Sequence, residues 1–282
     1  MTPKLIIHGG FYGELLPTSE IKTAKQRSLQ LILEKAYAYL LEHSALETVT
    51  FTVGLLENDP LFNAGTGSQI QNDGQIRASA GIMDGTSKKF GGVINLQGIK
   101  NPILVAHRLL DFEDRVLSGQ GAFTFAHEHQ FEEASLETQV RRKEYEEKLA
   151  ASRTSTVGCV ALDSEGRLAA ATSTGGKGFE IPGRVSDSAT IAGNYANNDC
   201  GISCTGVGED IVSAGVAVKA VTRVSDGMDL DQALDRTFAE LAEFDGFAGA
   251  IAIDAKGNIR YRESHPQVVY GWHDGEKTKT FE

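Results

Sequence analysis

Thr156 lies at an abrupt change in composition. The residues before it are rich in Glu, Arg and Lys, whereas the run 157–163 that follows is apolar. A threonine hydroxyl becomes a useful nucleophile when a base lies next to it. A threonine at the first position of a strand is also common, because Thr favours extended backbone. By itself the residue therefore leaves two interpretations open, a nucleophile and a strand edge.

Two further segments carry groups that could bind a small polar molecule. Arg184 and Asp187 are three residues apart, and a guanidinium can grip a carboxylate through two parallel hydrogen bonds while a carboxylate accepts from an ammonium. An ordinary surface ion pair is the alternative for such a pair. The segment 203–208, which contains Thr205 and Gly206, is either part of a site or a glycine-rich turn before a helix.

Other candidates are weaker. The run His127-Glu128-His129 would place both imidazoles on one face if it were a strand, but no third ligand lies nearby, so metal binding is disfavoured. Cys200 and Cys204 lack the second ligand pair of a zinc site and are interpreted as small buried residues. His8, beside a diglycine, is interpreted as a hydrogen-bonded core histidine.

The elements that must position these residues follow from periodicity and turn residues. The sequence predicts a strand at 5–8, helices at 19–42 and 47–56, strands at 76–83 and 92–96, and a helix at 102–110. After the charged segment it predicts a hairpin of 157–163 with 168–172, helices at 209–224 and 230–244, and a hairpin of 249–254 with 259–261. Grouped hairpins and paired helices favour an α+β fold over a doubly wound sheet.

Composition excludes several classes of function. The 282 residues carry a formal net charge of −11, which disfavours binding to nucleic acid or to an anionic membrane surface. The three cysteines are too few, and odd in number, for a disulfide framework, so a reducing compartment is expected. No apolar stretch reaches the length of a membrane span or of a signal peptide core, which makes the cytoplasm the expected location.

Taken together, the motifs resemble the plant-type L-asparaginase/isoaspartyl peptidase family of the N-terminal-nucleophile (Ntn) hydrolases. The resemblance covers nearly the whole chain and rests on many motifs in one order. They are Ile7-His8-Gly9-Gly10, the run from Leu56 to Gly65, Ile82-Met83-Asp84-Gly85, Ile99-Lys100-Asn101-Pro102, Thr156 to Asp163, Thr172 to Gly176, Pro182 to Ser188, Tyr195 to Asn198, Ser203 to Glu209 and Ile251 to Asp254.

The resemblance implies a four-layer αββα sandwich of the Ntn-hydrolase type. It implies one domain, 1–282, that cuts itself into an α-subunit of 1–155 and a β-subunit of 156–282, with 131–155 as a mobile linker. Two such pairs are expected to associate as (αβ)2. The expected substrates are L-asparagine, through its side-chain amide, and β-aspartyl (isoaspartyl) dipeptides.

It also implies the roles of the site residues. Cleavage between Ser155 and Thr156 frees an α-amine that serves as base for the hydroxyl of the same residue, while Thr174 orients that hydroxyl. The Thr205 hydroxyl and the Gly206 N–H stabilise the oxyanion. Arg184 and Asp187 grip the α-carboxylate and α-ammonium of the substrate. The other residues assigned to the substrate site are Asn63, Val185, Ser186, Val207 and Gly208.

No cofactor is expected for catalysis, but the resemblance implies a structural sodium ion. Its ligands are mostly main-chain carbonyls, so the side chains carry little signal. The matching positions are Leu56, Glu57, Asp59, Phe62, Ala64 and Thr66.

Four positions depart from the family pattern. Ser155 stands where Gly usually precedes the nucleophile, and Ser enters strained backbone regions less readily than Gly. Phe11, Ser79 and Ala248 replace Ala, Asp and Gly, and the first and last of these are expected to reshape the pocket. Two alternatives therefore stay open: a glycosylasparaginase-like amidase, and an unprocessed homologue that acts only in binding.

Overall fold

The structure is a computed structural model that describes residues 1–11, 19–147, 156–265 and 267–282. The helices are α1 (Ser19–Leu40), α2 (Ala45–Glu57), α3 (Pro102–Leu109), α4 (Gly119–Glu128), α5 (Gln139–Glu146), α6 (Gly208–Ala214), α7 (Val216–Ser225) and α8 (Leu230–Ala242), with a short 3-10 turn, η1 (Asp187–Ala189). The strands are β1 (Lys4–Phe11), β2 (Ala78–Asp84), β3 (Lys89–Leu96), β4 (Val116–Ser118), β5 (Val157–Leu162), β6 (Leu168–Thr174), β7 (Asn194–Ala196), β8 (Cys200–Gly206), β9 (Ala248–Asp254), β10 (Ile259–Glu263), β11 (Val268–His273) and β12 (Thr278–Thr280).

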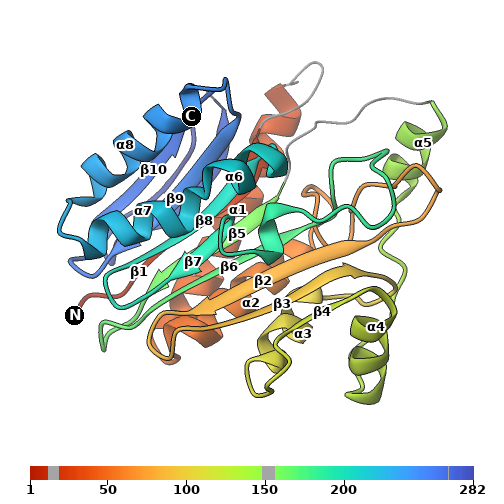
Figure 1. The fold of residues 1–282 in the computed structure, drawn as a ribbon, viewed down its shortest axis with the longest axis horizontal. Coiled ribbons are helices and arrows are strands. Elements are labelled where there is room, and N and C mark those ends of the chain that lie inside the picture. Colours follow the sequence, from red (N-terminus) through yellow and green to blue (C-terminus); the bar gives the residue numbers. More distant parts are fainter. Residues whose placement is uncertain (12–18, 148–155, 266) are drawn as a thin grey trace.

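These strands form two sheets. The larger has the order β12-β11-β1-β5-β6-β2-β3-β4, and the smaller has the order β10-β9-β8-β7. Helices α1, α2 and α3 pack on the larger sheet, and α7 and α8 pack on the smaller one (Figure 1). The sheets contact each other through β5 and β6 against β8, and through β1 against β9. The predicted α+β class is confirmed.

The period-2 alternation of apolar residues explains this packing. In β1, Leu5 and Ile7 join the core beneath α1 and α2, whereas Ile6 points into the core between the sheets. In β5, Cys159 belongs to the first core and Val160 to the second. A third core fills the space between the smaller sheet and helices α6 to α8. Even-numbered residues of β1, β5 and β6 therefore face the smaller sheet.

Local signals account for most of the helix ends. Ser44 and Glu47 form a capping box at the start of α2, and Pro102 begins α3 at the first helical position. The single helix expected at 209–224 is instead two, because Gly215 takes a left-handed conformation (φ 61°) that ends α6.

The His127-Glu128-His129 segment is not a strand. It is the last turn and C-cap of α4, so the idea of two imidazoles on one strand face is wrong. His127 Nδ1 instead lies 2.7 Å from the Glu133 carboxylate. Within the described ranges, no group of three or more His, Cys, Asp or Glu side chains could hold a metal ion.

The charged segment before Thr156 is in contact with the body of the protein over the part that the structure describes. Leu136 O accepts from Gly67 N at 3.0 Å, Arg141 Nε donates to Gly67 O at 2.8 Å, and Tyr145 stacks on Phe179. Residues 148–155, the rest of the predicted linker, lie outside the described residues, as does the Ser155 side of the predicted cleavage point.

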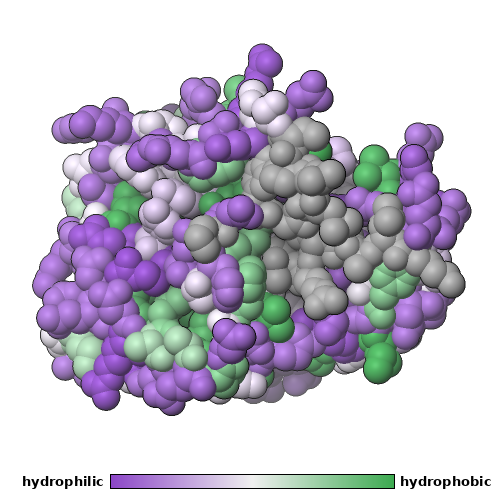
Figure 2. Space-filling model, turned by 90° about the horizontal axis from the view of Figure 1, so that it is seen from above, coloured by the Kyte–Doolittle hydropathy of each residue, from purple (hydrophilic) through white to green (hydrophobic). Residues whose placement is uncertain are grey.

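Figure 2 shows hydrophilic side chains over most of the face viewed from above, with small hydrophobic patches between them. None of the helices in the described part of the chain is both long enough and apolar enough to span a bilayer.

Candidate active site

Thr156 and Thr174 lie side by side at one end of the larger sheet. Thr156 Oγ1 donates to Thr174 Oγ1 at 3.3 Å, and Thr174 Oγ1 also accepts from Gly176 N at 3.2 Å. Thr174 is an even-numbered residue of β6, so it points into the space between the sheets, as Leu168 and Ala170 do. Apolar residues fill most of this space, and hydroxyls line its end.

Thr205 reaches the same space from the smaller sheet. It is a buried residue of β8, and among the described residues its Oγ1 has no hydrogen-bond partner. A buried hydroxyl without a partner costs free energy unless a ligand supplies one. The next residue, Gly206, has φ 140°, and a Cβ there would lie 2.4 Å from Phe247 O, so glycine is required.

A chain of buried polar side chains supports Thr156 from behind. His8 Nδ1 lies 3.0 Å from Thr156 O, so it donates to this carbonyl, and His8 Nε2 then accepts from Ser203 Oγ at 2.9 Å. The Thr172 hydroxyl lies 2.7 Å from Ser203 Oγ. Burial lowers the pKa of His8 to about 3, so the ring is neutral. The interpretation of His8 as a hydrogen-bonded core histidine is confirmed.

Gly158 makes this chain possible. A Cβ at Gly158 would lie 2.0 Å from Ser203 Oγ and 2.4 Å from His8 Nε2, and both clashing atoms belong to the buried chain. The glycine two residues after Thr156 therefore lets β8 and β1 approach β5 closely enough to hold the Thr156 carbonyl.

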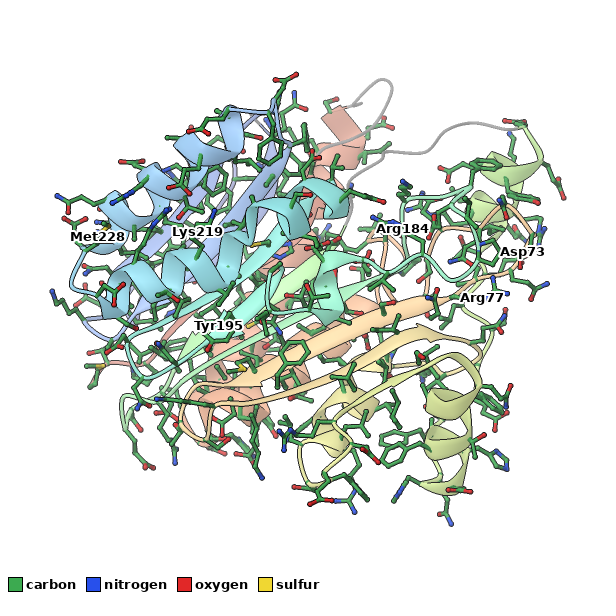
Figure 3. The ribbon with its side chains drawn as sticks, viewed as in Figure 1. Asp73, Arg77, Arg184, Tyr195, Lys219 and Met228 are labelled. Atoms are coloured by element: carbon green, nitrogen blue, oxygen red, sulfur yellow. The ribbon has the colours of Figure 1, made fainter. Side chains whose placement is uncertain are left out.

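Arg184 and Asp187 meet beside Gly208, on the β2–β3 side of the threonines. A Cβ at Gly208 would lie 2.7 Å from Arg184 Nη2 and 3.0 Å from Asp187 Oδ1. Arg184 is held by Asn95 Nδ2, which donates to its carbonyl at 3.1 Å, and by Glu209, which accepts from Nε at 2.8 Å and from Nη2 at 2.9 Å. In Figure 3 it lies on the side of the molecule away from Lys219 and Met228.

Asp187 is buried and only partly hydrogen-bonded. Ser186 Oγ donates to its Oδ1 at 3.3 Å, while Oδ2 has no partner in the described part of the chain. Burial raises the pKa of Asp187 to about 7, although the Arg184 charge opposes the shift. Such a carboxylate is suited to a cationic ligand that supplies the missing donor. Val185 is half exposed on the same loop, and Val207 precedes α6.

Asn63 ties the loop after α2 to the loop after β6. Its Nδ2 donates to Gly176 O at 2.5 Å, its Oδ1 accepts from Gln69 N at 2.9 Å, and its carbonyl accepts from Gly175 N at 3.0 Å. Asn63 therefore shapes the backbone next to Thr174. These contacts with the backbone of Gly175 and Gly176 place Asn63 close to the predicted site.

The loop 56–67, where a sodium ion is predicted, is closed by main-chain contacts. Gly67 has φ 97°, and a Cβ there would lie 2.8 Å from Phe62 O and 2.9 Å from Pro60 O. Thr66 N donates to Glu57 O at 2.7 Å, which closes the loop. Phe62 O and Pro60 O thus both lie beside Gly67, whereas Glu57 O and Asp59 O accept main-chain hydrogen bonds from Thr66 and Phe62.

Glu57 is a buried carboxylate that the sequence interpretation considered only for its carbonyl. Its side chain accepts from Ser173 Oγ at 2.6 Å, Ile103 N at 3.1 Å and Asn101 Nδ2 at 3.1 Å. Burial raises its pKa to about 7, against these three hydrogen bonds. Because Ser173 lies between Thr172 and Thr174, Glu57 anchors the strand that carries both.

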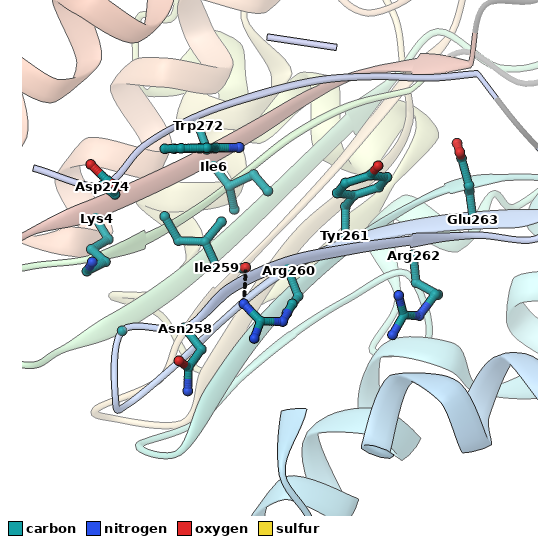
Figure 4. Close-up of a pocket in the computed structure, with 11 residues that line it drawn as sticks. Lys4, Ile6, Asn258, Ile259, Arg260, Tyr261, Arg262, Glu263, Trp272 and Asp274 are labelled. Carbon is teal, nitrogen blue, oxygen red and sulfur yellow. Dashed lines mark hydrogen bonds between the residues drawn. The ribbon is translucent and has the colours of Figure 1, made fainter. Parts of the chain in front are cut away.

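A separate pocket of about 610 Å³ opens beside β10 and over β1 and β11. Figure 4 shows Lys4, Arg260, Tyr261 and Trp272 around it. None of the predicted site residues that the structure describes lines this pocket. The chemistry that the threonines offer therefore lies elsewhere, at the end of the sheets.

Sequence reasoning missed three residues of this site as functional: Glu57, Glu209 and Ser203. Glu209 directly follows Gly208, which the sequence assigned to the pocket. A carboxylate at this position could have been predicted to pair with the guanidinium of Arg184. Ser203 and Glu57 gave no such signal, since each depends on a partner more than a hundred residues away.

Comparisons with known proteins agree with the motifs. The family model described as asparaginase matches residues 1–154 and 137–282. An isoaspartyl peptidase/L-asparaginase of Nostoc sp. is 44% identical over 296 residues, covering 98% of this chain and 93% of that protein. One of Synechocystis sp. is 45% identical over 294 residues, covering 98% and 89%.

More distant relatives carry related names. An isoaspartyl peptidase of Escherichia coli is 39% identical over 240 residues, covering 77% of this chain and 74% of that protein. A plant-type L-asparaginase of Thermococcus kodakarensis is 35% identical over 294 residues, covering 95% of each chain. The chain therefore belongs to the asparaginase family that its motifs resemble, that of the plant-type L-asparaginases and isoaspartyl peptidases.

Proposed function

We propose that this chain is an autoprocessed threonine amidohydrolase that cleaves the side-chain amide of L-asparagine and the isopeptide bond of β-aspartyl dipeptides. The observation that carries the proposal is the meeting of Thr156 with Thr174, opposite the Thr205 hydroxyl, which has no hydrogen-bond partner within the part of the chain that the structure describes. The names of the relatives from Nostoc and Synechocystis support both substrates.

In this mechanism the Thr156 hydroxyl first attacks the carbonyl carbon of Ser155, and the C–N bond between the two residues then breaks, which gives an ester and a free Thr156 amine. Water hydrolyses the ester to a Ser155 carboxylate and a free Thr156 hydroxyl. An α-amine has a pKa of about 7.7–8.0, so part of it is neutral near neutral pH and can accept the hydroxyl proton. The hydrogen bond from Thr156 to Thr174 holds the hydroxyl in place.

Substrate cleavage repeats the same chemistry on an external amide. Thr156 Oγ1 bonds to the substrate carbonyl carbon, and Thr205 Oγ1 with Gly206 N stabilises the oxyanion. The C–N bond then breaks, the leaving amine takes the proton from the Thr156 ammonium, and water hydrolyses the acyl ester. Arg184 and Asp187 bind the α-carboxylate and α-ammonium, which selects a free amino-acid end.

We extend the proposal to the architecture and the assembly. Three hydrophobic cores between successive layers support a four-layer αββα sandwich of the Ntn-hydrolase type. The α-subunit is 1–155, the β-subunit is 156–282, and two pairs associate as (αβ)2 in the cytoplasm. The carbonyls of Leu56, Glu57, Asp59, Phe62, Ala64 and Thr66 would hold a structural sodium ion, which keeps the loop around Asn63 in shape.

Intact-mass analysis combined with an amidase assay tests the proposal. Aged protein should give two fragments that sum to 30.3 kDa, one beginning at Thr156, and should hydrolyse L-asparagine and a β-aspartyl dipeptide. Thr156→Ala should stay uncut and inactive, whereas Thr156→Ser should retain some cleavage. Amide hydrolysis by protein with an intact 155–156 bond would contradict the mechanism.

The same experiment separates the alternatives. Turnover of a glycosylated asparagine in preference to the other substrates would favour a glycosylasparaginase-like amidase. A single band that binds L-aspartate without turnover would favour the unprocessed binding protein, for which Ser155 is the supporting feature.

A further inference from the structure

A row of aromatic rings runs from the buried end of β1 to the surface. The rings of Phe11 and Phe247 are 4.4 Å apart, and the rings of Phe247 and His265 are 4.6 Å apart and stacked. Phe11 is 2% exposed, Phe247 is half buried and His265 is exposed. We call these three residues the aromatic row.

The aromatic row begins beside the oxyanion position. Gly249 pairs with Thr205 across β9 and β8, and a Cβ on Gly249 would lie 3.1 Å from Phe11 Cζ. Phe247 O accepts from Val207 N at 2.9 Å, and Phe247 N donates to Asp210 Oδ2 at 2.9 Å. The backbone of Phe247 is therefore fixed beside the end of β8, which carries Thr205 and Gly206.

The aromatic row and the Arg184–Asp187 pair lie on opposite sides of the threonines. Phe11 belongs to β1, on one side of β5 and β6, whereas η1 with Asp187 packs on β2 and β3, on the other side. In the smaller sheet, Phe247 precedes β9, and β9 and β7 flank β8. The order across the site is thus aromatic row, threonines, then the charged pair.

This order assigns a direction to the leaving group. If Arg184 and Asp187 hold the amino-acid end, which rests on the proposed function, the acyl carbon lies at Thr156 and the scissile nitrogen points toward the aromatic row. Asparagine releases ammonia, which leaves the rings uncovered. A dipeptide places its second residue over them, where an aromatic side chain can stack.

We propose that the aromatic row is the leaving-group subsite and that it makes β-aspartyl dipeptides with an aromatic second residue the preferred substrates. Phe247 supplies most of the contact, because Phe11 is buried behind it and His265 extends the surface outward. Phe11 and Gly249 act as a pair, since the ring occupies the space that a side chain at 249 would need.

The test compares kcat/KM for L-asparagine, β-Asp-Ala and β-Asp-Phe in the processed enzyme. β-Asp-Phe should exceed β-Asp-Ala by about three- to ten-fold, the range that one aromatic contact contributes. In Phe247→Ala this ratio should fall to near one, while kcat/KM for L-asparagine stays unchanged. Phe247→Leu, which keeps bulk and folding, should give an intermediate ratio.

Phe244→Ala is the matched control, because Phe244 is a phenylalanine near the same loop with 49% exposure and should leave the ratio unaltered. Equal kcat/KM for the two dipeptides in the unmodified enzyme would overturn the subsite, as would an equal loss for all three substrates in the Phe247 variants. Absence of turnover with all three substrates would instead reject the proposed function.

Discussion

Glu209 accepts two hydrogen bonds from the guanidinium of Arg184, at 2.8 Å from Nε and 2.9 Å from Nη2. The edge of the guanidinium that Nε and Nη2 form is therefore occupied before any substrate arrives. Nη2 also faces Gly208 and Asp187. Arg184 holds the pKa of Glu209 down to about 2, so this pair stays ionised at any working pH. Glu209 thus positions Arg184, which belongs to the proposed substrate clamp.

Arg184→Lys should raise KM for L-asparagine about tenfold or more, because losing one charge-assisted hydrogen bond costs about 1.5–3 kcal/mol. Glu209→Gln should raise KM by about two- to five-fold, because Glu209 is half exposed, and should leave kcat unchanged. Steady-state kinetics on both variants checks this. An unaltered KM in Arg184→Lys would show that the clamp is misassigned.

Thr205→Ala should lower kcat by about 10²- to 10³-fold with little change in KM, because the hydroxyl is needed where oxyanion charge develops. Thr205→Ser keeps the donor and serves as the control, with most of kcat retained. The kinetics must be measured on material shown by mass to be cleaved. A rise in KM with kcat unchanged would instead assign Thr205 to ground-state binding.

Binding of L-aspartate should weaken as the pH falls below about 7. The pKa of Asp187 is raised to about 7 by burial, and its protonated form carries no charge for the α-ammonium. Each pH unit below that value should weaken Kd by up to about tenfold. Titration calorimetry with L-aspartate measures this binding directly, without the proton transfers that accompany catalysis. Asp187→Asn should bind L-aspartate weakly at every pH. A dependence of Kd on pH that persists in this variant would assign the titration to another group.

Glu57→Gln should flatten the dependence of stability on pH. Burial raises the folded-state pKa of Glu57 to about 7, so the stability linked to its protonation is present at low pH and lost as the pH rises through that value. Thermal midpoints between about pH 5 and pH 8 should fall less in the variant than in the parent. The variant will be less stable overall, because an amide cannot accept from all three donors. Parallel curves would contradict the assignment.

Ser155→Gly should speed self-cleavage. The attack of Thr156 on residue 155 needs strained backbone, which glycine enters at lower steric cost. The fraction of uncut chain, followed by intact mass after purification, gives the rate. Ser155→Ala is the control and should resemble the parent. Equal rates in all three would place the barrier elsewhere.

Much of the site was accessible from the sequence. The motifs named Thr156, Thr174, Arg184, Asp187 and Thr205. The structure brings the first two together, because Val157 pairs with Ser173 at the end of the hairpin. The strand 200–206 was not foreseen. Its small residues, Cys200 to Gly206, have weak strand preference, and it exists because β7 and β9 pair with it.

The sequence by itself determined which residues are proposed as the reacting groups, the local turns and caps, and the alternation of strand residues between the two faces of the larger sheet. Only the tertiary structure decided which distant groups support them: Glu209 on Arg184, Glu57 on Ser173, and His8 with Ser203 behind Thr156. The physical reason is that local signals act over a few residues. These hydrogen bonds instead depend on how two sheets stack, which the summed packing of three cores sets.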